Sequence, residues 1–205
     1  MDPTELALEQ LRKMDQFQWY VIFMFVVVLY IYFSEVKKKN FNAIIAGLVL
    51  YTIHWFVEII NALVQHFLGD ALWTVPDGSA FVLLVGVGIE LSLMFSIAGI
   101  TQTKLLPEDR KTKLFGLIPF PLAIGLGNAL IASVLEIFLS RTNVFYWAHS
   151  WWNSITVFFA VYIPFFVVSA YSYYWKRKYQ LLFLGIGASV NIIMLIVFIP
   201  ILDWI

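Results

Sequence analysis

Residues 51–65, which read YTIHWFVEIINALVQ, are the most informative stretch for the fold. Most of the stretch is as apolar as a membrane-spanning helix, yet it contains histidine, glutamate, asparagine and glutamine. Because a helix turns about 100° per residue, His54, Glu58, Asn61 and Gln65 fall within roughly 60° of one another. They form one polar stripe on an apolar rod. An ionisable group at bilayer depth is costly unless it is paired or faces a cavity, so the stripe indicates a functional site.

The composition places this stripe in an integral membrane protein. The 205-residue sequence is 61% hydrophobic, 18% aromatic and 13% charged, whereas soluble domains carry about 25% charged residues. The length allows one bundle of spans and no separate soluble domain. The chain has no cysteine, which excludes disulfides, thiolate metal ligands and thiol nucleophiles. Its basic residues form short clusters beside the spans, so we expect no nucleic-acid partner.

Six apolar segments are each close to the roughly 20 residues that cross a hydrocarbon core of about 30 Å. They cover residues 17–33, 41–67, 80–100, 115–139, 151–174 and 181–202. The sequence therefore predicts an all-α protein with a single six-helix transmembrane domain over residues 17–205 and no strand. Residues 1–16 form either an N-terminal interfacial helix, begun by Asp2 and Pro3, or a helical extension of the first span.

The basic residues predict the orientation of the bundle. Ten of the thirteen Lys and Arg lie in three alternate loops, which are Lys37, Lys38 and Lys39; Lys104, Arg110, Lys111 and Lys113; and Lys176, Arg177 and Lys178. By the positive-inside rule these loops are cytoplasmic, so both termini are expected on the non-cytoplasmic side. The prediction fits a plasma membrane and an endoplasmic-reticulum-type membrane alike.

Three ionisable groups are expected at one depth. Counting about 1.5 Å per residue puts His54 near the bilayer midplane, Glu58 slightly outward of it, and Glu90 near the middle of the third span. The other polar residues have simpler interpretations. Hydrogen bonding between helices is the simpler one for Asn128, Asn153 and Asn191. Solvation at the membrane interface is the simpler one for His66, Glu136 and His149.

The three groups at one depth suit proton transfer to an apolar molecule. Burial in an apolar pocket raises the pKa of a carboxylic acid, so that it stays protonated and can donate to a weak base such as an alkene. A second carboxylate or a neutral imidazole can take a proton back, and aromatic faces stabilise a carbocation. We therefore expect catalytic roles for His54, Glu58 and Glu90, with no metal or organic cofactor. The residues expected to position the substrate are Trp55, Asn61, Asn128, Trp152, Asn153 and Asn191.

A metal site is an alternative that the same residues leave open. His54 and Glu58 lie one turn apart and, with Glu90, Glu136 and His149, would make a His and carboxylate set that suits iron or zinc. The Glu-x-x-His motif of di-iron bundles is missing from the sequence. We therefore predict no metal.

Three features over residues 44–175 carry a resemblance to a known family. The run HWFVE at 54–58 has the spacing His-x-x-x-Glu, Asp77 precedes Glu90 across a loop, and Asn153 opens a later span. In these features the chain resembles the emopamil-binding proteins, a family of small membrane sterol isomerases and their ligand-binding relatives. The family's arginine just after the loop aspartate is absent here.

This resemblance implies a proton shuttle across a double bond by His54, Glu58 and Glu90, with Asn153 holding the charged intermediate. The layout is also similar to the membrane-bound meroterpenoid cyclases, in which a short basic loop precedes the second helix as the run KKKN at 37–40 does here. Members of both families protonate isoprenoid alkenes with a membrane-buried carboxylic acid.

The sequence thus predicts an isomerase or terpene cyclase that acts on a sterol-like or other isoprenoid lipid. It would protonate and deprotonate an alkene through a carbocation, with the lipid and the membrane as its partners. A non-catalytic lipid-binding, sterol-binding or accessory membrane protein is the alternative. A proton-coupled carrier is a third, although the sequence has no internal repeat of the kind that many transporters carry.

Overall fold

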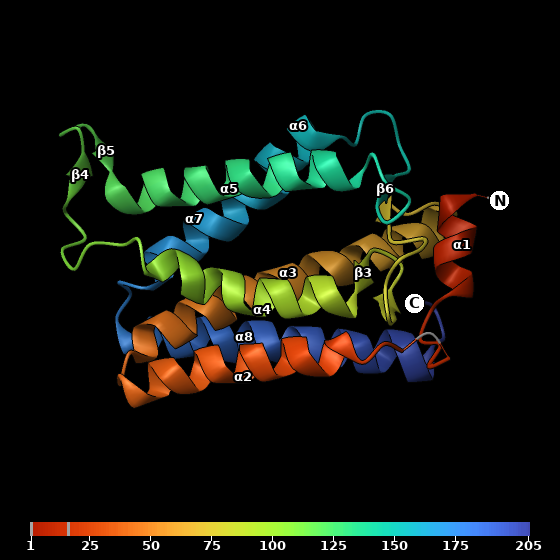
Figure 1. Cartoon of the computed structure of the whole chain (residues 1–205), viewed down its shortest axis with the longest axis horizontal. Helices are drawn as coiled ribbons and strands as arrows, with labels where there is room; N and C mark the ends of the chain where they lie inside the picture. Colours follow the sequence, from red (N-terminus) through yellow and green to blue (C-terminus); the bar gives the residue numbers. More distant parts are fainter. Residues whose placement is uncertain (1, 16) are drawn as a thin grey trace.

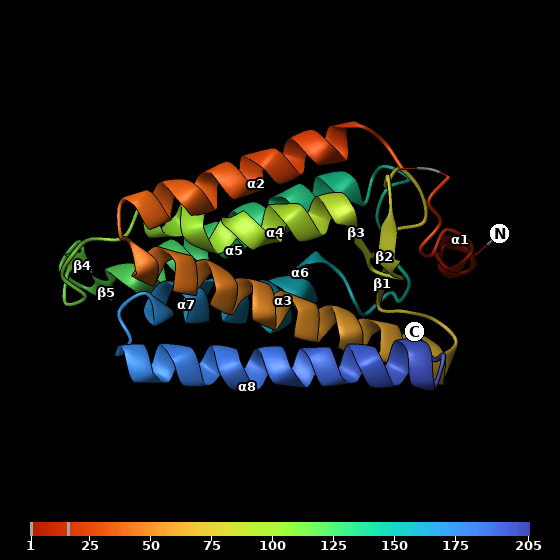
Figure 2. The same ribbon diagram turned by 90° about the horizontal axis from the view of Figure 1, so that it is seen from below.

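A computed structural model describes residues 2–15 and 17–205. The chain forms a bundle of helices that run along one axis (Figures 1 and 2). The long helices are α2 (Tyr20–Lys37), α3 (Phe41–Leu68), α4 (Ile89–Thr103), α5 (Phe120–Leu139) and α8 (Arg177–Ile196), which the π-helix η2 (Val197–Ile201) continues. A further rod is composite and consists of α6 (Ser154–Val157), the π-helix η1 (Phe158–Tyr162) and α7 (Ile163–Ser172).

The prediction of helical membrane spans is confirmed for most of the chain. In the described residues, five helices are long and apolar enough to cross a membrane, namely Tyr20–Lys37, Phe41–Leu68, Phe120–Leu139, Ser154–Ser172 and Arg177–Ile201. The third predicted span, residues 80–100, is different. Its helix α4 begins only at Ile89 and has 15 residues, because a hairpin of β2 (Val82–Leu84) and β3 (Val87–Gly88) precedes it.

Gly86 makes this hairpin possible. It lies in the turn between β2 and β3, where an added Cβ would stand 2.8 Å from Oε2 of Glu58. The backbone of the hairpin therefore packs directly against the polar stripe of α3, which a side chain at this position would prevent. A helix through this point would carry side chains into α3, and the sequence avoids that by turning.

The prediction that the chain has no strand is wrong. Besides the β2–β3 hairpin, β1 (Trp73–Thr74) pairs with β6 (Tyr146–Trp147) and β4 (Lys113–Leu114) pairs with β5 (Ile118–Pro119), all antiparallel. Each strand has only two or three residues, too few for alternating hydrophobicity to be visible in a sequence. The β1–β6 pair joins the loop after α3 to the loop after α5.

The N-terminal segment forms a helix of its own, α1 (Pro3–Glu9). Asp2 caps it by accepting a hydrogen bond from the Thr4 N–H over 2.7 Å. The chain then leaves the helical path, and the Arg12 N–H donates to the Val82 carbonyl over 2.9 Å. The segment therefore packs on the hairpin as a helix separate from α2. Met1 and Gln16, which complete the predicted segment 1–16, lie outside the described residues, and its place in the membrane interface stays a prediction.

Helix α3 lies at the centre of the bundle and packs on α4, α7 and α8. It meets α4 backbone to backbone, since an added Cβ on Gly99 would stand 2.7 Å from the Cα of Gly47. The loops that carry the basic clusters lie at one end of the bundle, and both termini lie at the other (Figure 1). The polar stripe of α3 thus runs through the interior of the molecule.

Candidate functional site

His54 and Glu58 are both buried within the bundle. His54 is 1% exposed and Glu58 is 4% exposed, and Nδ1 of the histidine lies 3.7 Å from Oε1 of the glutamate. The imidazole stacks on Phe95 of α4, with ring centroids 4.3 Å apart. Its Nε2 is buried and makes no hydrogen bond within the described structure. The helical spacing of the two residues thus gives an adjacent pair, as the sequence predicted.

Trp73 orients the Glu58 carboxyl from the loop that follows α3. Its indole Nε1 donates a hydrogen bond to Oε2 of Glu58 over 3.2 Å. Asn61 holds this loop in place, because its Oδ1 accepts from the N–H groups of Leu72 at 2.8 Å and Trp73 at 3.3 Å, while its Nδ2 donates to the Trp73 carbonyl at 2.8 Å. Asn61 was expected to position a substrate, whereas its amide is used within the protein.

Glu136 of α5 provides a second carboxyl at this site. It is 7% exposed, and its Oε2 has no hydrogen-bond partner in the part of the chain that the structure describes. The Glu58 and Glu136 carboxyls are close enough to interact electrostatically, and the Tyr162 hydroxyl interacts with both. The three groups come from α3, α5 and η1. They therefore form a polar cluster at the meeting point of three rods.

The π-helix η1 ends at Tyr162. A π segment inserts an extra residue into a helical turn, which rotates the side chains that follow, and such segments are frequent at functional sites. Pro164 comes two residues later and has no N–H to donate, so the normal helical hydrogen bond is missing here. This local irregularity places the Tyr162 side chain in the cluster rather than on the surface of the rod.

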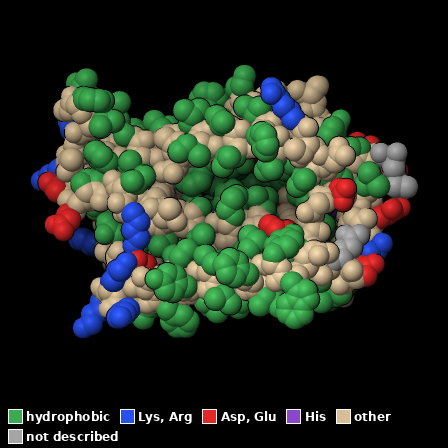
Figure 3. Space-filling model, viewed as in Figure 1, with side chains coloured by type: hydrophobic (Ala, Val, Ile, Leu, Met, Phe, Trp, Pro, Cys, Tyr) green, Lys and Arg blue, Asp and Glu red, His purple; other side chains and the backbone are tan. Residues whose placement is uncertain are grey.

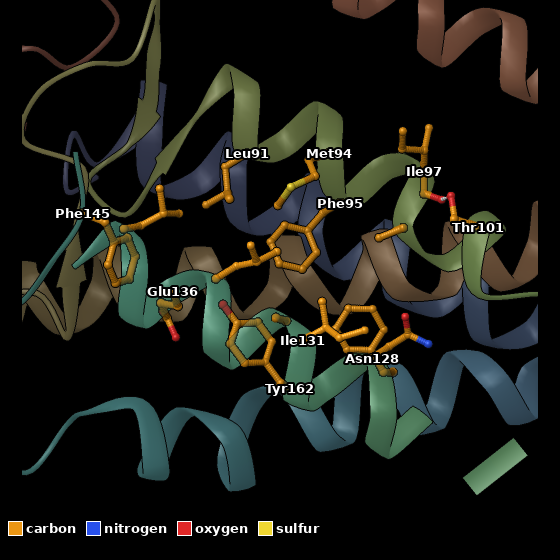
Figure 4. A pocket seen from close by; sticks show the side chains of 15 residues that line it. Leu91, Met94, Phe95, Ile97, Thr101, Asn128, Ile131, Glu136, Phe145 and Tyr162 are labelled. Carbon is orange, nitrogen blue, oxygen red and sulfur yellow. Dashed lines mark hydrogen bonds between the residues drawn. The ribbon is translucent and has the colours of Figure 1, made fainter. Parts of the chain in front are cut away.

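Two adjoining cavities meet at Glu136 and Tyr162. The smaller one has a volume of about 30 Å³ and is lined by His54, Glu58 and Trp73 besides these two residues. The larger one, between α4 and α5, has a volume of about 270 Å³ and an otherwise mainly apolar lining. Figure 4 shows Glu136 toward one end of the larger cavity, Asn128 toward the other, and the Tyr162 ring between them. The polar cluster therefore has direct access to an apolar space.

Glu90 lies outside this cluster. Its carboxylate accepts hydrogen bonds from the Tyr20 hydroxyl, the Ser79 hydroxyl at 2.7 Å and the Ala80 N–H at 2.7 Å. It lines a different cavity, of about 370 Å³. The expectation that three groups at one depth share one site thus fails for Glu90, because depth along a span does not determine the direction in which a side chain points. Glu136, which we expected to be solvated at the interface, takes its place beside Glu58.

The other asparagines mostly hold the fold together. Asn153 caps α6 by accepting from the Ile155 N–H at 3.0 Å. Asn191 joins α8 to α3 by donating to the Thr52 carbonyl at 2.8 Å. Asn128 donates to the Ile124 carbonyl at 2.9 Å, within its own helix, but it also lines the larger cavity. Of these three predicted substrate contacts, only Asn128 reaches the apolar space.

The two tryptophans expected at the substrate lie on different sides of α3. Trp152 stacks on Trp73, with ring centroids 5.8 Å apart, and so supports the residue that orients Glu58. Trp55 packs instead against the separate core cluster that contains Ile59 and Leu84. For the metal alternative, no group of three or more His, Asp or Glu side chains able to hold a metal ion occurs among the described residues.

Comparisons with known proteins establish the family. A family model described as an uncharacterized membrane protein family matches residues 1–200. The chain belongs to this family. A protein of Archaeoglobus fulgidus, described as an uncharacterized protein, is 43% identical over 213 residues, which cover 99% of this chain and 100% of the relative. No solved structure matches the chain. The comparisons thus support a membrane protein and give no support to the resemblance to the emopamil-binding proteins.

In this member of the membrane protein family, Tyr162 was not among the predicted site residues, and Glu136 was expected to be solvated at the membrane interface. Each had a signal in the sequence. Glu136 is the one carboxylate in the apolar segment 115–139, and Tyr162 stands two residues before a proline within a span. Neither signal says which way the side chain points, so the pairing of Glu136 with Glu58 required the packing of α5 against α7 and η1.

Proposed function

We propose that this protein binds an isoprenoid-like lipid within the membrane and moves a proton to and from one of its double bonds. Isomerases and cyclases of such lipids share this reaction. One observation carries the proposal: Glu136 and Tyr162 line both the small polar cavity that contains His54 and Glu58 and the larger apolar cavity beside it. A lipid in the larger cavity would lie against the Glu136 carboxyl.

The larger cavity is suited to a ligand that arrives from the bilayer. Three residues at the cavity, Met94, Ile131 and Leu135, are 42%, 60% and 52% exposed, and in a bundle that crosses a membrane such apolar surface faces lipid tails. Figure 3 shows this face of the molecule hollowed between the helices, with hydrophobic side chains deep in the hollow. An apolar space with few polar groups is typical of a site for a small hydrophobic molecule.

The two carboxyls can supply the proton. Among the described ion pairs, neither Glu58 nor Glu136 has a Lys or Arg partner. Two adjacent buried negative charges are unfavourable, so we expect the pair to hold at least one proton between them. The small cavity, at about 30 Å³, exceeds the roughly 10–15 Å³ that a water needs. A water there would connect Glu58 to Glu136.

The reaction balances without an oxidant or a reductant. The O–H bond of the Glu136 carboxyl breaks, and its proton forms a C–H bond with one alkene carbon by using the π electron pair. The other alkene carbon becomes a carbocation, which the rings of Phe95 and Tyr162 stabilise. A neighbouring C–H bond then returns a proton to the Glu136 carboxylate, or through the water to Glu58, and a double bond forms at the new place. In a cyclase, a second double bond would attack the cation before this proton is lost.

Deuterium incorporation tests the proposal. Protein purified in detergent and incubated in heavy water with geranylgeraniol or squalene is expected to return lipid that carries deuterium at a shifted or cyclised double bond. Glu136→Gln and Glu58→Gln should remove this signal. If neither lipid gains deuterium above a protein-free control, or if both variants incorporate it as the native protein does, proton transfer at this pair is ruled out for these substrates.

Lipid binding without turnover is the second candidate. It is favoured by one observation: Asn61, Asn153 and Asn191 are used within the protein, which leaves few polar side chains to direct a reaction. The same experiment separates the two candidates, because a binding protein would retain geranylgeraniol saturably and return it without deuterium.

We also propose that the bundle lies with its basic end in the cytoplasm, with the β2–β3 hairpin and α4 together completing a sixth crossing. The common end of the basic loops supports this orientation, by the positive-inside rule. Because the chain has no cysteine, single cysteines at Lys37 and Asp77 should label from opposite sides of intact vesicles. Labelling of both from the same side would contradict the proposed orientation.

A further inference from the structure

The cavity at Glu90 adjoins the larger cavity of the candidate site. It has a volume of about 370 Å³ and includes Met24 of α2 and the loop residues Gly78 and Ser79. Both cavities are lined by Leu91, Met94, Leu139 and Phe145. Together they make one apolar trough over α4, and Figure 3 shows an acidic side chain at the margin of the hollow. The trough therefore has a polar end at Glu90, besides the polar cluster at Glu136 and Tyr162.

That polar end presents a hydrogen-bond acceptor. A carboxylate offers about four acceptor positions, and the donors that face Glu90 are the Tyr20 and Ser79 hydroxyls, the Ala80 N–H and its own N–H. The two hydroxyls among these donors are already directed at Glu90. The ion pairs of the described chain give Glu90 no cationic partner. A ligand group that donates a hydrogen bond can therefore replace one of the two hydroxyls at Glu90, whereas a negatively charged group would be repelled.

We propose that Glu90 binds the head group of the lipid, and that this head group is a hydrogen-bond donor, an alcohol or an ammonium group, at the end of a single apolar chain. Such a lipid would be the ligand of the site described under the proposed function. Its conversion rests on that proposed function, whereas its binding at Glu90 does not. It excludes prenyl phosphates and fatty acids as preferred ligands, because their head groups would bring a second negative charge to Glu90.

The geometry also places the reactive part of the ligand. Leu91 and Phe145 line all three cavities, so a chain whose head is at Glu90 passes them before it reaches Glu136 and Tyr162. From Glu90 to Thr101 the helix advances about 16 Å, at about 1.5 Å per residue. A double bond just beyond the part of the chain that passes Leu91 and Phe145 would lie beside Glu136, and the rest of the chain would extend along α4 toward Thr101.

Competition between matched lipids tests the head group. Tritiated geranylgeraniol bound to the full-length protein in nanodiscs is displaced by unlabelled geranylgeraniol, geranylgeranylamine, geranylgeranyl methyl ether or geranylgeranyl phosphate. The alcohol and the amine should compete roughly tenfold better than the ether, because the ether has no donor for a charged acceptor. The phosphate should compete no better than the ether. Equal competition by alcohol and ether would overturn the proposal, and this comparison needs only the native protein.

Variants separate this inference from the proposed function. Glu90→Gln should remove the preference for alcohol over ether, and the amine should lose more affinity than the alcohol because the charge is gone. Glu136→Gln should retain the preference even though deuterium incorporation is lost. Met94→Trp, which fills the trough, should weaken all four lipids alike. An unchanged preference in Glu90→Gln would contradict head-group binding, whereas a retained preference without any deuterium transfer would contradict only the reaction.

Discussion

The indole of Trp73 donates a hydrogen bond to Oε2 of Glu58 over 3.2 Å, and both side chains are buried. Trp73 belongs to β1, whose partner strand β6 carries Trp147, a residue that interacts with the Glu136 carboxyl. The loops at this end of the bundle therefore contact both carboxyls of the candidate site. A change in these loops should act on the site as well as on the fold.

Replacing Trp73 with Phe tests the hydrogen bond without removing the ring. The expected cost is about 1–3 kcal/mol in the free energy of unfolding, because the buried Glu58 carboxyl loses its indole donor. Unfolding in mixed detergent and dodecyl sulfate micelles measures it. Trp152→Phe is the matched control, since the Trp152 Nε1 makes no hydrogen bond among the described residues. Equal losses in the two variants would mean that ring packing alone explains the effect.

Asn61→Ala should be more damaging than Asn191→Ala. The first change leaves the N–H groups of Leu72 and Trp73 and the Trp73 carbonyl without their partner, whereas the second releases only the Thr52 carbonyl. At about 1–3 kcal/mol for a buried polar group left unpaired, we expect Asn61→Ala to cost more than about 2 kcal/mol and Asn191→Ala about half as much. Retention of native stability by Asn61→Ala would show that this loop is not held as described.

Glu136→Gln should lower the rate of deuterium incorporation by about 10²–10⁴-fold, the usual contribution of a positioned acid or base. The measurement is mass spectrometry of lipid recovered from heavy water, at a protein concentration where binding of geranylgeraniol is saturated. Glu108→Gln is the control, because Glu108 is exposed in the loop between α4 and β4 and lines neither cavity of the site. A loss of similar size in both variants would point to damage to the protein rather than to a role of Glu136.

Hydropathy predicted most of the helices because each span must bury its own backbone hydrogen bonds in lipid, whatever its neighbours are. The segment 80–100 was the exception, since its path depends on a contact made elsewhere. The chain turns at Gly86 because its backbone must fit against Glu58. Hydropathy gives no information about that contact. Hydropathy therefore predicted the spans whose path depends only on their own sequence. It failed for residues 80–100, whose path depends on packing against α3.

The sequence predicted the part of the candidate site that lies on one helix and not the part that comes from other helices. His54 and Glu58 are four residues apart on one helix, so the helical period alone makes them neighbours. Glu136 meets them only through the packing of α5, and Tyr162 only through the π-helix that precedes Pro164. Depth in the membrane favoured Glu90 over Glu136 as a partner of His54 and Glu58. In the structure, Glu136 points toward these two residues and Glu90 points elsewhere. The sequence alone does not give the rotation of each helix about its own axis, and this rotation decides which side chains meet.

Gly99→Ala should separate α3 from α4 and thereby loosen the site. An added Cβ at this position would stand 2.7 Å from the Cα of Gly47 and 2.8 Å from the carbonyl oxygen of Ala46, and neither backbone atom can rotate away. Overpacking of this kind costs about 1–3 kcal/mol, and the stack of Phe95 on His54 should weaken because Phe95 lies on α4 one turn before Gly99.

Gly127→Ala on α5 is the matched control for this change. An added Cβ there meets nothing within 4 Å, and alanine favours a helix over glycine by about 0.8–1.0 kcal/mol in an exposed position. We therefore expect Gly127→Ala to be neutral or stabilising in the same unfolding titration, while Gly99→Ala unfolds at lower dodecyl sulfate and binds geranylgeraniol less tightly. If Gly99→Ala instead matches Gly127→Ala in both measurements, α3 and α4 do not touch through their backbones, and His54 cannot depend on that contact for its place beside Phe95.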